Sequence, residues 1–318
     1  MKIIVLEGYT LNPGDLDWGV LTALGDVTIY ERTSDDEISE RAKDADAILS
    51  NKYRLTADVF SQLQNLKYVG VLATGYDSID VNTAIKHGIT VTNVPTYGTR
   101  SVAQMTFAHI LHISHKLAEH DHGVKAGKWS GVPDYCYWDY PQTELADKVF
   151  GILGMGRIGR AAAEIGEAFG MKIQYFDPVP VKSIRDRWAS VSLRELFESS
   201  DILSLHCPLT PETKEIVNRD HLKLMKNTAI LINTSRGGLV NSTDLAEALN
   251  KGIISAAGLD VLDKEPPPND HPLIGIPNCF ITPHIAWATQ AARQRLLNTA
   301  VENLKAFMRG EKLNEIIS

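Results

Sequence analysis

The stretch from Lys148 to Asp177 constrains the fold more than any other part of the chain. Val149 to Leu153 is a short apolar run with the length and β-branching of a buried strand, and it leads directly into Gly154-Met155-Gly156-Arg157-Ile158-Gly159. A second apolar run, Ile173 to Phe176, ends on Asp177. The order of strand, glycine turn, helix, strand and acid predicts a parallel α/β unit that binds a dinucleotide.

The three glycines and the acid have separate physical roles in this prediction. Gly154 permits the tight turn, Gly156 lets the backbone approach a pyrophosphate, and Gly159 lets the helix pack closely on the strand. The helix start directs N–H groups and the positive end of its dipole toward the phosphates. The Asp177 carboxylate can accept hydrogen bonds from a ribose 2′-OH and would repel a 2′-phosphate, which favours NAD over NADP. The alternative is a structural loop without a nucleotide.

Length, charge and hydropathy limit the class of protein. The chain has 318 residues, enough for two domains with hydrophobic cores. Its formal net charge of −7 and the lack of a Lys/Arg block argue against nucleic acid as the main partner. No stretch reaches the about 18 consecutive apolar residues that would cross a membrane. The apolar run at Met1 to Glu7 is shorter than a signal sequence, so we expect a cytoplasmic protein.

The residues that commonly bind metals do not form a metal pattern. Three cysteines, Cys136, Cys207 and Cys279, are far apart and indicate buried thiols rather than disulfides or a metal site. Five histidines lie in one predicted helix without acidic or cysteine partners at ligand spacing, which favours a partly solvated helix face. They are His109, His112, His115, His120 and His122. No metal is therefore expected.

The remaining sequence alternates strand and helix signals, which predicts an open α/β fold with mostly parallel sheets. The expected strands are 3–6, 27–30, 47–50, 68–72, 201–205, 229–232, 256–259 and 279–282. The expected helices lie near 15–24, after the capping-box pair Ser34 and Glu37, and near 56–63, 101–125, 193–197 and 288–308. Ala45 to Ser50 resembles Ser200 to Ser204, and this internal similarity suggests two similar lobes.

Two segments outside the glycine turn also suggest a function. Thr74 and Gly75 follow the predicted strand 68–72, and a Thr-Gly turn at the carboxyl end of a strand offers backbone N–H groups to an anion. The same residues could form a plain turn before the helix near Asp80. Trp129 to Pro141 is an aromatic, proline-bearing loop that either packs over a core or contacts a partner, and we favour a homodimer contact.

Three residues downstream of the nucleotide unit, Arg236, Glu265 and His284, have the chemistry of a redox site for 2-hydroxy and 2-oxo acids. An arginine binds a carboxylate with two hydrogen bonds and can polarise an adjacent carbonyl. A histidine can give and take the proton that accompanies hydride transfer, and a carboxylate bound to the imidazole fixes its tautomer. Singly, the three could be a strand-end ion pair, a loop acid and a helix-start residue. Together they favour catalysis.

The ordered motifs resemble the D-isomer-specific 2-hydroxyacid dehydrogenases over nearly the whole chain. They are the glycine turn, His206-Cys207-Pro208-Leu209-Thr210, Asn233-Thr234-Ser235-Arg236-Gly237, Gly258-Leu259-Asp260-Val261 with Glu265, and Thr282-Pro283-His284. The resemblance implies two Rossmann-like or flavodoxin-like lobes with parallel sheets. An NAD-binding domain, residues 99–286, would be inserted into a discontinuous substrate domain, residues 1–98 and 287–318. It also implies a homodimer held by the inserted domain.

By this resemblance Arg236 binds the substrate carboxylate and carbonyl, His284 is the general acid during reduction, and Glu265 supports His284. Thr74 and Gly75 match the loop that binds the substrate carboxylate. The positions that match cofactor-lining residues are Gly154, Gly156, Arg157, Ile158, Gly159, Asp177, His206, Pro208, Thr213, Thr234, Asp260 and His284. Glu265 argues against the related formate dehydrogenases, which carry glutamine at this position.

Within the family, three further segments are similar to the bacterial glycerate dehydrogenases, also called hydroxypyruvate reductases. They are Val94 to Thr99 with Val102 to Gln104, Trp138 to Pro141, and His284 to Trp287. The resemblance implies NADH-dependent reduction of a small 2-oxo acid, with hydroxypyruvate to D-glycerate favoured and glyoxylate as a second substrate. Two alternatives stay open: a D-lactate dehydrogenase, and a dinucleotide-sensing binding protein similar to transcriptional corepressors of the same fold.

Overall fold

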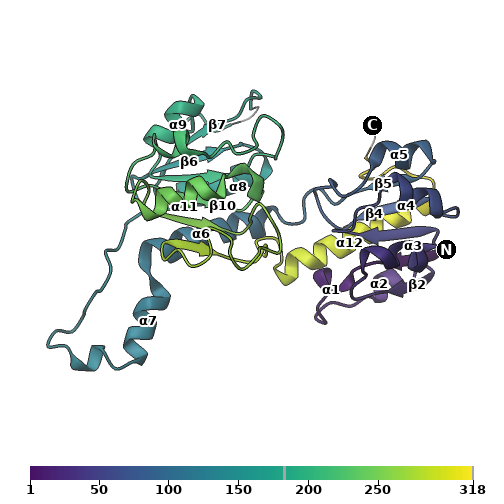
Figure 1. Ribbon diagram of the computed structural model, residues 1–318, viewed down its shortest axis with the longest axis horizontal. Helices are drawn as coiled ribbons and strands as arrows, with labels where there is room; N and C mark the ends of the chain where they lie inside the picture. Colours follow the sequence, from purple (N-terminus) through teal and green to yellow (C-terminus); the bar gives the residue numbers. More distant parts are fainter. Residues whose placement is uncertain (182–183, 317–318) are drawn as a thin grey trace. The chain divides into compact units, whose positions relative to one another are not determined.

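The apolar runs of the sequence form two parallel sheets in the computed structural model, which describes residues 1–181 and 184–316. Each sheet belongs to its own unit of the chain (Figure 1). The first unit consists of Met1–Gly98 and Trp287–Ser318, and the second of Thr99–Ala286. The two ends of the chain therefore share one unit, and the middle of the chain forms the other.

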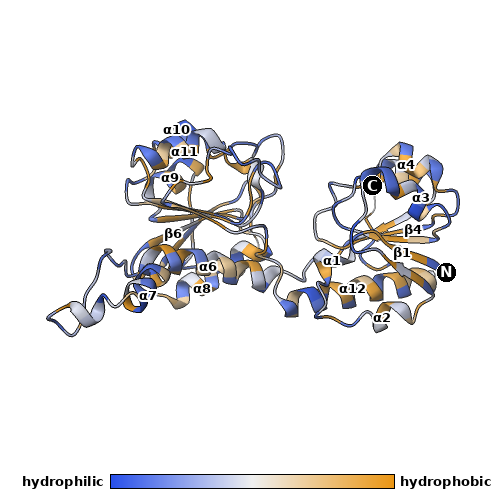
Figure 2. Ribbon diagram, turned by 60° about the horizontal axis from the view of Figure 1, so that its bottom comes forward, coloured by the Kyte–Doolittle hydropathy of each residue, from blue (hydrophilic) through white to orange (hydrophobic). Residues whose placement is uncertain are grey.

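The first unit contains a five-stranded sheet with the order β2-β1-β3-β4-β5, in which all neighbours are parallel. Its strands are β1 (Lys2–Val5), β2 (Asp26–Ile29), β3 (Ala47–Ser50), β4 (Tyr68–Val71) and β5 (Thr90–Thr92). Helices α3 (Ile38–Ala42), α4 (Ala57–Gln62) and α5 (Val81–Lys86) cover one face, and α1 (Gly8–Leu11), α2 (Gly19–Thr22) and α12 (Gln290–Met308) cover the other (Figure 2). A parallel sheet covered on both faces has strands that are buried along their whole length, as the mostly apolar β3 and β4 are.

The second unit contains a seven-stranded parallel sheet with the order β12-β11-β10-β9-β6-β7-β8. Its strands are β6 (Val149–Leu153), β7 (Lys172–Phe176), β8 (Ala189–Ser190), β9 (Ile202–Leu205), β10 (Ile230–Asn233), β11 (Ala256–Leu259) and β12 (Cys279–Ile281). Helices α6 (Thr99–His115) and α8 (Arg157–Ala168) pack on one face, and α9 (Leu193–Ser199), α10 (Arg219–Leu222) and α11 (Ser242–Asn250) on the other (Figure 2). The strand order reverses between β6 and β9, and ligands of doubly wound sheets bind at such a switch point.

The expected helix near residues 15–24 is wrong in extent, since only α2 is helical there. The Asn12 side chain accepts hydrogen bonds from the N–H groups of Gly14 and Leu16 and donates to the Leu16 carbonyl. Asp17 accepts a hydrogen bond from the N–H of Gly19 at 2.8 Å. Short polar side chains that bond to nearby backbone compete with helix formation, so this segment is a loop.

The expected single helix from Ser101 to about Lys125 is also wrong. It consists of α6 and a second helix, α7 (Leu117–Lys125), because Lys116 between them has a φ of 50°. The Lys116 ammonium lies 4.2 Å from the centre of the Phe280 ring. No residue of α7 is buried, and α7 with the segment after it extends away from the sheet of its own unit (Figure 1).

Smaller features of the fold concern the capping box, the cysteines, and membrane or metal sites. The capping box of Ser34 and Glu37 is confirmed, although it opens a 3₁₀ turn, η1 (Asp35–Glu37), ahead of α3. Cys207 is buried as expected, whereas Cys136 and Cys279 are only partly buried. Within residues 1–181 and 184–316, no helix is long and apolar enough to cross a membrane, and no group of histidine, cysteine and acidic side chains could hold a metal ion.

Candidate active site

The glycine turn between β6 and α8 has the geometry that a dinucleotide site requires. Gly154 has a φ of 95°, and a Cβ on it would lie 2.6 Å from the N atom of Cys207. A Cβ on Gly159 would lie 2.2 Å from the carbonyl oxygen of Gly154, so the fold itself requires both glycines. A Cβ on Gly156 would meet no atom within 4 Å. Open space therefore faces the backbone at the start of α8, where Arg157 and Ile158 follow.

Asp177 lies against this turn. Its Oδ2 accepts a hydrogen bond from the N–H of Met155 at 2.8 Å, and its Oδ1 accepts one from the N–H of Val179 at 3.0 Å. A carboxylate has about four lone-pair positions, so two acceptor positions are left for a further ligand. The structure thus brings the acid at the end of β7 and the glycine turn together as one binding surface.

The segment after β9 adds a shielded polar atom to the site. His206 Nε2 is 2.9 Å from the Ser204 hydroxyl, whereas the buried Nδ1 has no hydrogen-bond partner among the described residues. Burial lowers the pKa of His206 to about 4, so the ring is neutral near pH 7. A buried polar atom without a partner costs about 1–3 kcal/mol, which a bound polar group would offset. Together with the open space at Gly156, this observation fits a bound dinucleotide.

The loop that follows His206 is closed by its own side chains. The Thr213 hydroxyl donates to the carbonyl of Pro208 at 2.7 Å and accepts from the N–H of Thr210 at 2.8 Å. Thr234, which follows β10, has its hydroxyl 3.1 Å from that of Thr106 on α6. These contacts give the segments at Pro208 and Thr234 fixed shapes at the carboxyl ends of neighbouring strands.

Arg236 leaves β10 through a turn shaped by Asn233. The Asn233 amide donates to the Arg236 carbonyl at 2.9 Å and accepts from the N–H of Ser235 at 3.0 Å. A Cβ on Gly237 would lie only 1.9 Å from the carbonyl carbon of Leu262, so the backbone after Arg236 passes directly against the loop that leads to Glu265. Only glycine permits this approach.

His284 and Glu265 form a direct pair. His284 Nδ1 is 2.6 Å from Glu265 Oε2, and Glu265 Oε1 accepts the N–H of Leu262 at 3.0 Å. Burial would raise the pKa of Glu265, but the hydrogen bond and charge of His284, the Leu262 N–H and the charge of Arg236 together hold this pKa below its usual value. An ionised carboxylate only accepts hydrogen bonds, so Nδ1 of His284 carries the proton and Nε2 is the nitrogen that can exchange one.

Asp260, which directly follows β11, organises the backbone around His284. Its Oδ1 accepts from the hydroxyl of Thr282 at 2.6 Å and the N–H of Ile285 at 3.0 Å, and its Oδ2 accepts the N–H of Ala286 at 2.8 Å. His284 lies in this segment with a φ of 53°, a conformation that non-glycine residues rarely adopt. The carboxylate of Asp260, 1% exposed, thus stabilises a strained turn.

Thr74 and Gly75 belong to the first unit, after β4. The Thr74 hydroxyl donates to the Val94 carbonyl at 2.8 Å, and the Asn93 amide donates to the Thr74 carbonyl at 2.7 Å. These bonds fix the turn and leave the backbone N–H groups of Thr74 and Gly75 without an acceptor among the described residues. The turn therefore offers donors to an anion, as the sequence suggested.

Sequence reasoning missed one residue of this network. His109, expected on a partly solvated face, is 4% exposed, and its Nε2 is 3.1 Å from the Thr282 hydroxyl. Burial lowers the pKa of His109, and the charge of His112 lowers it further, against the opposing effect of Asp260. His109 lies at helical spacing from apolar residues of α6 such as Val102. This spacing could have predicted that His109 is buried with them.

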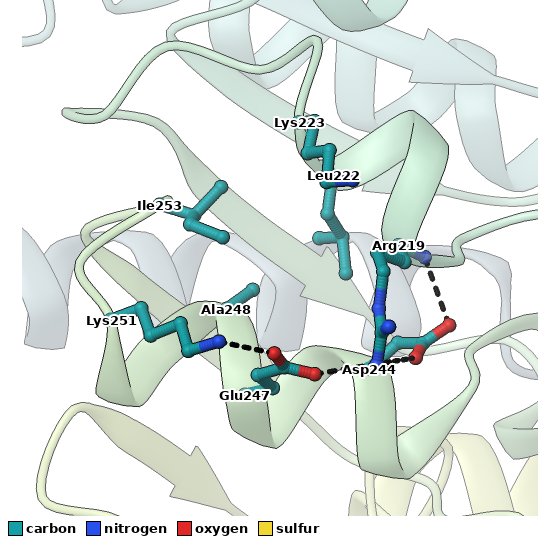
Figure 3. Close-up of a pocket in the computed structure, with 8 residues that line it drawn as sticks. All are labelled: Arg219, Leu222, Lys223, Asp244, Glu247, Ala248, Lys251 and Ile253. Atoms are coloured by element: carbon teal, nitrogen blue, oxygen red, sulfur yellow. Dashed lines mark hydrogen bonds and ion pairs between the residues drawn. The ribbon is translucent and has the colours of Figure 1, made fainter.

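A pocket elsewhere in the second unit carries no comparable chemistry. It lies between α10 and α11 and is lined by Arg219, Leu222, Lys223, Asp244, Glu247, Ala248, Lys251 and Ile253 (Figure 3). Arg219 pairs with Asp244 and Glu247, and Lys251 also pairs with Glu247. Most of its charges therefore neutralise one another, which leaves the strand ends as the candidate active site.

The chain is similar to known proteins over most of its length. Residues 107–286 match the model of the D-isomer specific 2-hydroxyacid dehydrogenase, NAD binding domain. A hydroxypyruvate reductase from Blautia hydrogenotrophica is 48% identical over 99% of each chain, and a glycerate dehydrogenase from Methylorubrum extorquens is 38% identical over 90% of each. The crystal structure of the TT0316 protein from Thermus thermophilus superimposes with a TM-score of 0.88 at 34% identity, over 100% of both chains.

Proposed function

The chain belongs to the D-isomer-specific 2-hydroxyacid dehydrogenase family, and from this premise we propose that it uses NADH to reduce hydroxypyruvate to D-glycerate. The observation that supports the catalytic assignment is the 2.6 Å contact of His284 with Glu265, in a loop that the backbone after Arg236 closely approaches. Two relatives, a hydroxypyruvate reductase and a glycerate dehydrogenase, support the choice of substrate.

In this proposal each of the three residues acts on one part of the substrate. Arg236 binds the carboxylate through paired N–H groups and polarises the 2-oxo group. The bound nicotinamide supplies the hydride. His284 donates the proton from Nε2 to the carbonyl oxygen and regains one from solvent. Glu265 accepts the hydrogen bond from Nδ1 and so fixes the orientation of the ring.

We propose the cofactor residues that the family resemblance implies, and the geometry around the glycine turn supports this choice. We assign the pyrophosphate to the backbone at Gly154, Gly156 and Gly159 with Arg157 and Ile158. Asp177 would read the ribose, and its negative charge is our reason to favour NAD over NADP. His206, Pro208, Thr213, Thr234, Asp260 and His284 complete the proposed cofactor surface.

The proposal extends to Thr74 and Gly75 as further ligands of the substrate carboxylate. Backbone N–H groups without an acceptor favour an anion, and a 2-oxo acid carries one at neutral pH. The turn is fixed by Asn93 and Val94, so little ordering is needed on binding. Glyoxylate has the same carboxylate and 2-oxo group without the hydroxymethyl substituent, and we expect it to react as well.

We also propose a homodimer formed through an arm that consists of α7 and residues 126–141. This arm exposes large apolar side chains that a lone chain would leave in water: Leu117 at 67%, Trp129 at 50%, Tyr135 at 90% and Trp138 at 72%. Aromatic residues are enriched at subunit interfaces. The cysteines of the chain are unpaired thiols, which suits the cytoplasm as the proposed location.

The test is the consumption of NADH by the purified protein with hydroxypyruvate, glyoxylate, pyruvate, phosphohydroxypyruvate and 2-oxoisocaproate, repeated with NADPH. We expect the highest kcat/KM for hydroxypyruvate with NADH. A preference for pyruvate would replace the proposed substrate and favour a D-lactate dehydrogenase. Unchanged turnover in the Arg236→Gln protein would contradict the assignment of the site.

A further inference from the structure

The proposed chemistry leaves one buried carboxyl group without a role. Glu7 lies just beyond β1 in the first unit and is 1% exposed. Its Oε1 accepts hydrogen bonds from the backbone N–H groups of Asn51 and, at 3.2 Å, Lys52. The hydroxyl of Ser50 donates to Oε2 at 3.1 Å. All three donors belong to the end of β3 or to the turn that follows it.

Glu7 is costly to bury, and it is the acceptor for two backbone N–H groups of the turn. Burial raises the pKa of Glu7 to about 7, although the N–H groups of Asn51 and Lys52, the Ser50 hydroxyl and the charge of Lys52 all act to lower it. The N–H groups of Asn51 and Lys52 have no other acceptor among the described residues. An apolar side chain at this position would leave both donors unsatisfied.

The turn that Glu7 holds is connected to the segment that carries Thr74 and Gly75. The Ser78 hydroxyl donates to the carbonyl of Asn51 at 3.1 Å, and the N–H of Leu55 donates to the carbonyl of Ser78 at 3.0 Å. Asp80 in turn donates its N–H to the Leu55 carbonyl at 3.0 Å. Because β3 and β4 are parallel neighbours, the two segments leave the same edge of the sheet side by side.

We propose that Glu7 is a positioning residue that holds the turn at Asn51 and Lys52 and, through Ser78, keeps the Thr74–Gly75 backbone in the shape that binds the substrate carboxylate. The opposite side of that backbone is fixed by the bond of Thr74 to Val94. Glu7 therefore supports the turn from the side of β3, whereas Asn93 and Val94 support it from the other side. This inference rests on the proposed role of Thr74 and Gly75.

The test compares Glu7→Ala with Glu7→Gln. Alanine removes all three hydrogen bonds, whereas glutamine can still accept both N–H groups through its carbonyl and donate its amide to Ser50. We expect Glu7→Ala to raise the KM for hydroxypyruvate about tenfold, because the buried turn loses three hydrogen bonds, and to change kcat less than about twofold. Glu7→Gln should restore most of the affinity, and the KM for NADH should not change.

Asp46→Ala is the matched control. Asp46 directly precedes β3 and accepts the N–H of Lys2 at 2.8 Å, so it joins the same two strands at the opposite edge of the sheet. This variant should lower the melting temperature without raising the KM for hydroxypyruvate. An equal rise of KM in Asp46→Ala and Glu7→Ala would show a general effect of stability and would overturn the inference.

Two further variants keep the test decisive if Glu7→Ala does not fold. Ser78→Ala removes the link between the two segments and should raise the same KM about threefold, in line with a typical single hydrogen bond. Gly75→Ala tests the carboxylate turn itself. A raised KM in Gly75→Ala with normal values in the Glu7 and Ser78 variants would contradict the role of Glu7 alone. Normal values in all of them would remove Thr74 and Gly75 from the proposed substrate site.

Discussion

The N–H of His284 donates to the carbonyl of Asp260 at 2.8 Å, and this bond attaches the proposed acid to the end of the neighbouring strand. The carboxylate of Asp260 binds the next two N–H groups, those of Ile285 and Ala286. His284 can therefore keep its rare positive φ while its ring lies against Glu265. A residue expected to line the cofactor thus also holds the backbone of the proposed catalytic acid.

Replacing His284 by alanine should abolish most of the turnover. The proton donor is lost, so kcat for hydroxypyruvate reduction should fall by about 10²- to 10⁴-fold. Stopped-flow and steady-state measurements of NADH consumption would show this. His87→Ala, on the exposed end of α5, is the control and should react like the unmodified protein. Turnover within about tenfold of the unmodified protein in His284→Ala would remove His284 from the mechanism.

Replacing Glu265 by glutamine should shift the pH profile of the reaction. The pKa of Glu265 is held below its usual value, so the side chain is charged at neutral pH, and its Oε2 lies 2.6 Å from Nδ1 of His284. Without that charge, the pH at which reductive kcat/KM falls to half should move about one unit lower. Glutamine can still accept the Nδ1 proton, so maximal turnover should survive. A profile that does not move would contradict the pairing.

Asp177→Asn should weaken the discrimination between NADH and NADPH by about tenfold or more. Asparagine keeps an oxygen that can accept the N–H of Met155 and so preserves the glycine turn, but it removes the charge that would repel a 2′-phosphate. The ratio of kcat/KM for the two cofactors measures the effect. Glu164→Ala, on the exposed side of α8, should leave that ratio as it is. An unaltered ratio in Asp177→Asn would mean that another residue reads the ribose.

Glu7 should make the stability of the protein depend on pH. Its pKa is raised from 4.5 to about 7, so the folded state binds a proton that the unfolded state has released between these values. The free energy of unfolding should therefore fall as the pH rises through this window, by up to about 3 kcal/mol, and Glu7 should add no further change above it. Denaturant titrations of Glu7→Gln at several pH values should lack this part of the slope. Identical slopes for both proteins would refute the prediction.

Charged residues on the arm should convert a dimer into monomers. Tyr135 and Trp138 are 90% and 72% exposed, and the double variant Tyr135→Lys, Trp138→Lys would place repelling charges in the proposed interface. Sedimentation velocity should show a dimer for the unmodified protein and a monomer for the variant. Val179→Lys, 67% exposed and outside the arm, is the control and should stay dimeric. A monomeric unmodified protein would contradict the proposed assembly.

Local sequence patterns indicated the glycine turn and most of the strands, but not the short strands β5 and β8. Apolar runs such as Ile202–Leu205 are buried on both faces in any parallel sheet, so composition alone indicates them. The role of Gly159 also follows locally, because a Cβ there would lie 2.2 Å from the carbonyl oxygen of Gly154. A Cβ on Gly154 would instead meet Cys207, which only the folded sheet brings near. The capping box at Ser34 is also local, so it could be predicted from two residues three positions apart.

Tertiary structure decided whatever depends on residues far apart in the chain. Lys116, where α6 and α7 separate, contacts the ring of Phe280, and buried His109 contacts Thr282 and Gly258. Glu7 is an ordinary acid at a strand end until the fold places Asn51, which is 44 residues away, against it. Periodicity records which face of an element is apolar, but it does not record which polar atoms meet there. Those contacts form only when the strands and loops have packed.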